Sequence, residues 1–201
     1  MNFVGSIIWM PRAHLLRYCQ AVAASYILPP MLEAISQLRQ TNPTWQFILP
    51  LAPTIALAQV IALSESVPSL NLIENDTYNA VAAADLAVVA SGTATLETAL
   101  LGTPLIICYR ASALNWKLFT PFIKVPYVGM PNLIAGREIA PELLQHNLTA
   151  AALAQQINSF LTDPVRLIQA RADLADVKEK LGTAQASACA AALLMNHFMK
   201  E

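Results

Sequence analysis

Hydrophobic residues in the central part of the chain follow two kinds of pattern. Short runs in which almost every position is apolar alternate with longer stretches in which apolar residues recur every three or four positions. The clearest runs cover residues 86–90 and 105–109. Such runs are typical of strands buried on both faces, as in a parallel sheet between two layers of helices. The pattern therefore predicts an α/β protein with a Rossmann-like parallel sheet flanked by helices.

The same patterns predict the order of the elements up to residue 109. A helix over residues 30–40 would place Met31, Ile35 and Leu38 on one buried face. Strands separated by helices of this length are typical of βαβ units, in which the connected strands run parallel. We expect strands at 46–51, 70–73, 86–90 and 105–109, and helices at 30–40, 54–63, 78–84 and 93–101.

The C-terminal part of the chain has a different pattern. After Pro141, apolar residues recur every three to four positions, which predicts that the chain is helical to its end. Asp163 and Pro164 are typical of a helix start, and Gly182 is typical of a helix end. We therefore expect a helical C-terminal extension, with helices at 149–161, 164–181 and 184–198.

The composition excludes nucleic acid as a partner. The 201 residues include 12 basic and 13 acidic ones, a net charge of −1, so the chain lacks the excess of basic residues that nucleic-acid binding usually needs. Only 12% of the residues are charged, against about 25% in an average soluble domain. Either the core is large or part of the surface contacts a partner.

The three cysteines, Cys19, Cys108 and Cys189, lie far apart. Their spacing fits neither a zinc site nor a disulfide framework. We interpret them as small buried apolar residues of a protein from a reducing compartment. We expect no metal ion and no cofactor.

Two apolar stretches resemble membrane or export signals. Residues 40–64 carry no charged side chain, but Pro50 and Pro53 interrupt them, so we reject a transmembrane helix there. The first 32 residues include Arg12 and Arg17 and lack an uninterrupted apolar core before a cleavage site. The signal-peptide pattern there is weak.

Candidate chemistry lies where the third of these strands ends, because ligands of such sheets bind beyond the carboxyl ends of the strands. Ser91 could cap the next helix, and Gly92 lets a ligand approach the backbone closely. Amide hydrogens at a helix start attract phosphate oxygens, and Thr93 and Thr95 add hydroxyl donors. Glu97 would share a helix face with Thr93 and accept hydrogen bonds from a ribose. The pattern fits a nucleoside diphosphate, and plain helix capping is the alternative.

A second candidate segment, rich in proline and glycine, follows. Asn132 can both donate and accept hydrogen bonds, and Arg137 offers a planar set of donors for phosphate or carboxylate. Glu138 and Glu142 are four residues apart and would share a helix face. Arg110, which directly follows a strand, is placed like a phosphate partner. The alternatives are a solvated turn and an ordinary surface arginine.

At these segments the sequence resembles the lipid-A-disaccharide synthase family of bacteria. The resemblance begins near Ile27 and continues to the end of the chain. The matching segments are LPPMLEA at 28–34, FILPLAP at 47–53, ASGTATLE at 90–97, ALLGTP at 99–104, YR at 109–110, KVPY at 124–127, PNLIAGRE at 131–138 and PELLQ at 141–145.

The resemblance implies a glycosyltransferase of the GT-B type, in which two Rossmann-like domains face each other across a cleft. This chain would be the C-terminal, donor-binding half. The family transfers 2,3-diacylglucosamine from UDP to 2,3-diacylglucosamine 1-phosphate with inversion and without a metal. The lipid substrates imply a cytoplasmic protein at the surface of the inner membrane. The implied donor-site residues are Ser91, Gly92, Thr93, Thr95, Glu97, Arg110, Asn132, Arg137, Glu138 and Glu142.

Two features depart from the family. The acceptor domain, with the catalytic base of the family, is absent from these 201 residues, and residues 1–26 lack the family's Pro-Gly-Ser-Arg loop. We therefore divide the chain into a divergent segment at 1–26, a UDP-sugar-binding domain at 27–148 and C-terminal helices at 149–201. We interpret it as the product of a truncated or frame-shifted gene that turns over poorly alone. An intact upstream acceptor domain in the same reading frame would refute this interpretation.

Two other interpretations stay open. The chain could be a non-catalytic nucleotide-sugar-binding subunit that pairs with a separate acceptor domain. It could also be a nucleotide-dependent epimerase or a binding module, but the segments at 90–97 and 131–138 favour the glycosyltransferase family. Without a facing domain, Leu193, Leu194 and Phe198 would lack a partner. This predicts an exposed apolar stripe and self-association.

Overall fold

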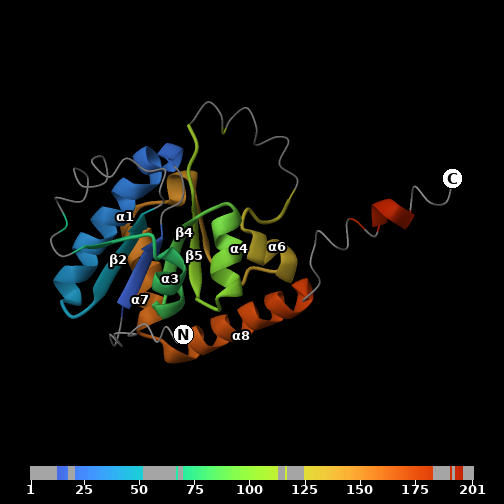
Figure 1. Cartoon of the computed structure of the whole chain (residues 1–201). Coiled ribbons are helices and arrows are strands. Elements are labelled where there is room, and N and C mark those ends of the chain that lie inside the picture. The colour runs from blue at the N-terminus through green and yellow to red at the C-terminus, as the bar shows by residue number, and fades with distance from the viewer. Residues whose placement is uncertain are drawn as a thin grey trace.

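Figure 1 shows the computed structural model of the chain, in which one parallel sheet lies between two layers of helices. The strands are β1 (Ala13–Arg17), β2 (Gln46–Leu51), β3 (Asn71–Glu74), β4 (Ala87–Ala90), β5 (Leu105–Tyr109) and β6 (Glu142–Leu144). The helices are α1 (Ala21–Thr41), α3 (Thr77–Ala83), α4 (Thr93–Leu100), α6 (Met130–Ala135), α7 (Ala150–Leu161) and α8 (Pro164–Leu181), with a 3-10 turn η2 (Gln145–Asn147). The structure describes residues 13–17, 21–51, 67, 70–112, 116, 125–182, 191 and 193–196.

The strand order is β3-β2-β1-β4-β5-β6, and every neighbouring pair is parallel. This is the order of a Rossmann fold. The chain first builds outward from β1 to β3 and then returns to the other side of β1, where β4 pairs with it. Ligands of such sheets bind in the crevice beyond the carboxyl ends of the strands at this reversal, which places the start of α4 beside the expected binding position.

Neighbouring residues of the central strands face opposite layers. Val88 and Ala90 of β4 belong to a buried cluster with residues of α1 and α7, whereas Ala87 and Val89 belong to a second cluster with residues of α3, α4 and α8. All four are at most 3% exposed. Because both faces of β4 are buried, the strand has to be apolar at every position, as the sequence pattern indicates.

The predicted fold class is confirmed, and most predicted elements in the described residues lie within one residue of the observed ones. Met31, Ile35 and Leu38 form a buried face of α1, as expected. The helix expected at 54–63 lies outside the described residues. Of the helix expected at 184–198, the structure describes residues 191 and 193–196. Leu193 and Leu194 are 71% and 57% exposed, while Phe198 lies outside the described residues.

The prediction that the chain is helical after Pro141 was wrong. The strand β6 and the turn η2 follow Pro141 before the next helix begins. β6 has three residues and exists because it pairs with the edge of β5. A strand this short shows no periodicity, so the sequence pattern does not distinguish it from the helices that follow. Consequently Glu138 and Glu142 do not share a helix face.

The segment before residue 27 contains two features that the sequence patterns did not indicate. β1 pairs with β2 on one side and with β4 on the other, at the centre of the sheet. The helix α1 begins at Ala21 and continues through Pro29 and Pro30, although proline removes the amide hydrogen that a helix interior needs.

Candidate functional site

The turn between β4 and α4 is an exposed start of a helix. Ser91 extends the strand ladder by one bond, in which its amide donates to the carbonyl of Cys108 at 2.8 Å. Gly92 then adopts a φ of +149°, a region that favours glycine, and a Cβ at this position would meet no atom within 4 Å. Gly92 and Thr93 are both exposed. The front of this turn is therefore open for a ligand to approach the backbone.

Ser91 does not cap α4, contrary to expectation. The residue at the cap position is Gly92, and α4 has no side-chain cap. The Ser91 hydroxyl instead donates to the carbonyl of Val128 at 3.2 Å, which connects the turn to a segment 37 residues further along the chain. Plain helix capping therefore does not explain the serine.

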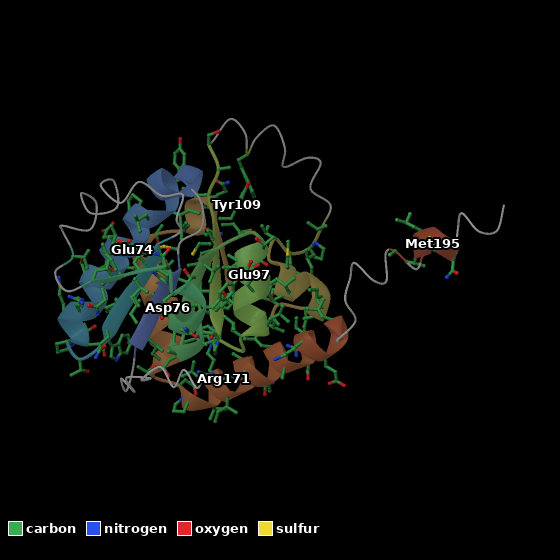
Figure 2. All side chains as sticks on the ribbon, viewed as in Figure 1. Glu74, Asp76, Glu97, Tyr109, Arg171 and Met195 are labelled. Carbon is green, nitrogen blue, oxygen red and sulfur yellow. The ribbon has the colours of Figure 1, made fainter. Side chains whose placement is uncertain are left out.

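The other polar residues of α4 point in different directions. Thr95 is fully buried, and its hydroxyl donates to the carbonyl of Gly92 at 2.7 Å, so Thr95 stabilises the turn from inside. Thr93 lies at the exposed first position of the helix. Glu97, four residues later, is half-buried. Figure 2 labels its side chain on α4, together with that of Tyr109 at the carboxyl end of β5. Thr93 and Glu97 share one face of α4, as their spacing predicts.

Glu142 forms the centre of the second segment. Its Oε2 accepts a hydrogen bond from the amide of Val128 at 2.9 Å, and its Oε1 accepts one from the amide of Gly129 at 2.9 Å. Gly129 is the cap position of α6, so the carboxylate stabilises the start of that helix. A Cβ at Gly129 would lie 2.2 Å from Cδ1 of the buried Ile107, so any larger residue there would force that side chain to move.

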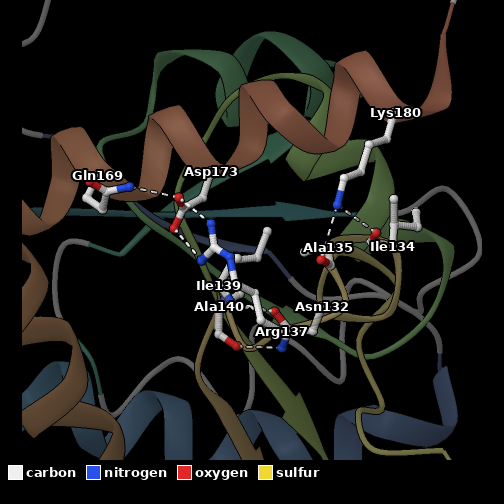
Figure 3. Close-up of polar contacts among 9 residues, drawn as sticks. All are labelled: Asn132, Ile134, Ala135, Arg137, Ile139, Ala140, Gln169, Asp173 and Lys180. Atoms are coloured by element: carbon white, nitrogen blue, oxygen red, sulfur yellow. Dashed lines mark hydrogen bonds and ion pairs between the residues drawn. The ribbon is translucent and has the colours of Figure 1, made fainter.

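Asn132 is fully buried and uses its whole hydrogen-bonding capacity within the protein. Figure 3 draws it with two of its partners, Ile139 and Ala140. Its Nδ2 donates to the carbonyl of Ala140 at 2.7 Å and to Oε1 of Glu142 at 2.8 Å. Its Oδ1 accepts hydrogen bonds from the amides of Ile139 at 2.8 Å and Ala140 at 2.9 Å. Asn132 thus joins α6 to the start of β6.

Two cationic side chains, Lys180 and Arg137, connect the end of α6 and the residues that follow it to α8 (Figure 3). Lys180 of α8 donates to the carbonyls of Ile134 and Ala135 at 3.4 and 3.2 Å, at the end of α6. Arg137 makes two hydrogen bonds to Asp173 of α8, at 2.8 and 3.2 Å. Hydrogen bonding to Arg137 holds the pKa of Asp173 below its usual value, and the same pair raises the pKa of Arg137. Neither Asp173 nor Lys180 stood out in the sequence, because both follow ordinary helical spacing.

Glu138 lines a surface hollow whose other lining residues do not include Ser91, Gly92 or Thr93. It is exposed, and the hollow, of about 540 Å³, is also lined by Phe160 and Arg166. Hydrogen bonds thus connect Ser91 to Val128, Val128 to Glu142 and Glu142 to Asn132, whereas the side chain of Arg137 bonds to Asp173.

Arg110 bonds to backbone carbonyls of two elements. Its Nε and Nη2 donate to the carbonyl of Gln145 at 3.2 and 3.0 Å, its Nη2 also to that of Leu148, and its Nη1 to that of Tyr26 at 3.3 Å. Tyr26 lies four residues before Pro30, whose nitrogen has no hydrogen to donate to it. Arg110 supplies that missing donor and fastens α1 to the turn η2.

Cys108 is fully buried, and burial raises the pKa of its thiol, although Arg110 opposes this effect. The interpretation as a buried apolar residue is thus confirmed for Cys108, while Cys19 and Cys189 lie outside the described residues. Within the described ranges, no three His, Cys, Asp or Glu side chains group in a way that could hold a metal ion.

Two solved structures share the fold at low sequence identity. A spinosyn rhamnosyltransferase matches with a TM-score of 0.62 and 12% identity, over 94% of this chain and 45% of that chain. A UDP-GlcNAc 2-epimerase from Neisseria meningitidis, bound to UDP-GlcNAc, matches with a TM-score of 0.58 and 14% identity, over 94% of this chain and 45% of that chain. The chain thus has the Rossmann-like fold of one half of a GT-B protein.

Sequence comparison is more specific. The lipid-A-disaccharide synthase of Syntrophus aciditrophicus is 41% identical over 177 residues, which cover 87% of this chain and 46% of that protein. The chain spans about half the length of the curated relatives it matches. A profile of the lipid-A-disaccharide synthetase family matches residues 22–195. The chain therefore belongs to the lipid-A-disaccharide synthetase family.

Proposed function

We propose that this chain binds the donor UDP-2,3-diacylglucosamine in lipid A biosynthesis. The donor sugar would pass to 2,3-diacylglucosamine 1-phosphate, giving the lipid A disaccharide and UDP. The observation that carries the proposal is the exposed start of α4, which has no side-chain cap and lies beside the reversal point of the sheet. Membership of the family supplies the substrate class.

The diphosphate would lie against the Ser91–Thr93 turn. The amide dipoles at the start of α4 favour negative charge, and Gly92 leaves room for the phosphate oxygens. During transfer the departing UDP gains negative charge, which the same dipoles would stabilise. Glu97, one turn beyond Thr93, would accept hydrogen bonds from the ribose hydroxyls. That the Neisseria epimerase of the same fold is bound to UDP-GlcNAc supports a nucleotide sugar on this scaffold.

The remaining candidate residues would support the structure around this site without binding the ligand. Their polar groups bond to the protein itself, as described for Thr95, Arg110, Asn132, Arg137 and Glu142. Glu138 lines the hollow near α8. We propose that β1 joins residues 27–148 in the donor-binding unit, and that residues 149–201 add helices to it. The catalytic base and the acceptor site would come from a facing domain.

We also propose that the protein works at the cytoplasmic surface of the inner membrane, where both lipid substrates would be found. Among the described helices, none has the length and hydropathy to span a bilayer. In this proposal, contact with the membrane comes through the acyl chains of the substrates.

Calorimetric titration with UDP tests the proposal. We expect UDP to bind the unaltered protein and to bind Glu97→Ala more weakly. Glu179→Ala is the control, because Glu179 is an exposed glutamate on α8. Equal affinity of the protein and Glu97→Ala would remove Glu97 from the site. A crystal soaked with UDP that holds the nucleotide away from the Ser91–Thr93 turn would overturn the proposal.

A second candidate function needs only the donor site described above. In this alternative the chain binds the nucleotide sugar but transfers it only when a separate acceptor domain is present. An assay of transfer with both lipid substrates distinguishes the two functions. UDP binding without turnover, with turnover restored by an added acceptor domain, would favour the binding subunit.

A further inference from the structure

Val128 is held from two sides by side chains of different elements. Its carbonyl accepts the hydroxyl of Ser91 at 3.2 Å, and its amide donates to Oε2 of Glu142 at 2.9 Å. Ser91 directly precedes Gly92, whereas Glu142 begins β6. These contacts fix the segment 125–129 beside the start of α4.

We propose that Glu142 is a positioning residue of the donor site, which sets the geometry of the Ser91–Thr93 turn through Val128 without contacting the nucleotide. This inference rests on the proposed function and deepens it. In this role the Glu142 carboxylate holds the backbone of Val128 and Gly129, which would border the diphosphate.

The hydrogen bonds of Glu142 explain why it would act through another residue. Oε1 accepts two hydrogen bonds, from the Gly129 amide and from Nδ2 of Asn132, and Oε2 accepts one from the Val128 amide. Asn132 is itself fixed by three further bonds to the backbone of Ile139 and Ala140. The carboxylate is thus oriented towards the segment 125–129 and held there.

The segment that Glu142 holds lies at the protein surface. Val125 is 54% exposed, and Tyr127 and Val128 are half-buried, while Gly129 is buried against Ile107. The Val128 carbonyl shares a peptide unit with the Gly129 amide, which donates to Oε1 of Glu142. If that amide lost its acceptor, the peptide unit could rotate and the Val128 carbonyl would leave Ser91. The hydroxyl of Ser91 would then be released at the position where the diphosphate is proposed to bind.

The test compares Glu142→Gln with Asp163→Ala by calorimetric titration with UDP. The amide of glutamine keeps the size of the side chain but places an NH2 group against hydrogen-bond donors. Asp163 is a matched control, because its carboxylate likewise accepts backbone amides at a helix start, those of Val165 and Arg166 in α8. Thermal unfolding measures the loss of stability in each variant.

We expect Glu142→Gln to weaken UDP binding roughly tenfold, the size expected when a charged hydrogen bond is lost. Asp163→Ala should lower stability but leave the UDP affinity unchanged. In a double variant with Ser91→Ala, the two losses of affinity should be less than additive, because both act on Val128. Equal affinity of Glu142→Gln and the unaltered protein, with Ser91→Ala weakened, would overturn the inference and leave the proposed function standing.

A measurement on the unaltered protein covers the case in which Glu142→Gln fails to fold. Hydrogen exchange of the Val128 and Gly129 amides should slow when UDP is added, because UDP bound at the turn would stabilise the hydrogen bond from Ser91 to Val128. Unchanged exchange of both amides in a protein that binds UDP would refute the inference. Absence of UDP binding to the unaltered protein would refute the proposed function and this inference with it.

Discussion

The turn from Ser91 to Thr93 leaves its glycine and threonine exposed, whereas in the segment from Val128 to Glu142 the side chains of Asn132 and Glu142 bond to the segment's own backbone. In the sequence the two segments look alike, since both combine glycine with small or amide side chains and an acid. In the structure Gly92 has open space in front of it, while Gly129 lies against Ile107. One segment presents backbone to a ligand, and the other supports it.

This difference indicates which polar residues of a motif can bind a ligand. A side chain whose donors and acceptors are all used within the protein, as those of Asn132 are, has no group left for a ligand. A polar residue at an exposed helix start, such as Thr93, can bind one. The same motif can therefore contain binding residues and residues that hold the site in shape.

The largest effect that separates the two segments should come from Asn132→Ala. The substitution leaves buried backbone groups of Ile139 and Ala140 without partners, so the free energy of unfolding should fall by about 3 kcal/mol. Urea denaturation followed by circular dichroism measures this. A change below about 1 kcal/mol together with a strong loss of UDP affinity would mean that Asn132 is a ligand after all.

Gly92→Ala should have the next largest effect. The φ of +149° strains any residue with a Cβ, so we expect a loss of about 1–2 kcal/mol in stability and weaker UDP binding. Gly102→Ala is the matched control, because Gly102 also has a positive φ, of +74°, and open space around it. If both variants bind UDP as well as the unaltered protein, the Ser91–Thr93 turn is not the binding site.

A smaller contrast is expected within α4. Thr95→Val removes the hydrogen bond to the Gly92 carbonyl and should lower stability by about 1 kcal/mol. Thr93→Val, at an exposed position, should change stability by less than about 0.5 kcal/mol but weaken UDP binding. Thermal unfolding and calorimetry on the same samples measure both quantities. The reverse assignment of the two effects would show that Thr95, not Thr93, faces the ligand.

The smallest effect concerns the ion pair of Arg137 and Asp173, which is exposed on the arginine side. Because the pKa of Asp173 is lowered in the folded protein, the pair stabilises the fold at pH values above the usual aspartate pKa, about 3.9. This stability is lost as the pH falls through the lower folded-state value. Asp173→Asn should remove that part of the acid sensitivity, measured as unfolding temperature between about pH 3 and 7. An identical pH dependence in both proteins would contradict it.

The sequence predicts those features whose signals are local. The helix α8 matches its predicted bounds, because Asp163 accepts the first amides and Gly182 ends the helix with a positive φ. The strand β5 matches because both of its faces are buried and every core position is apolar.

Features that depend on distant contacts could not be predicted. The strand β6 is too short to show a period and forms by pairing with β5. The role of Glu142 depends on Val128, fourteen residues away, and that of Ser91 depends on the same residue from the other direction. The sequence singled out Ser91, Asn132 and Glu142 as candidates, but it did not indicate which groups they bond to.

The contact between Arg110 and the Tyr26 carbonyl makes two distant positions interdependent. A chimera that exchanges residues 21–41 for a helix without Pro30 would give the carbonyl of residue 26 its own helical donor, and one Arg110 hydrogen would then need a new acceptor. Conversely, a helix that retains the proline but is grafted onto a protein without an arginine at this position would leave that exposed carbonyl to bond to water instead. A swap of residues 21–41 in this chain should therefore keep Pro30 and Arg110 together.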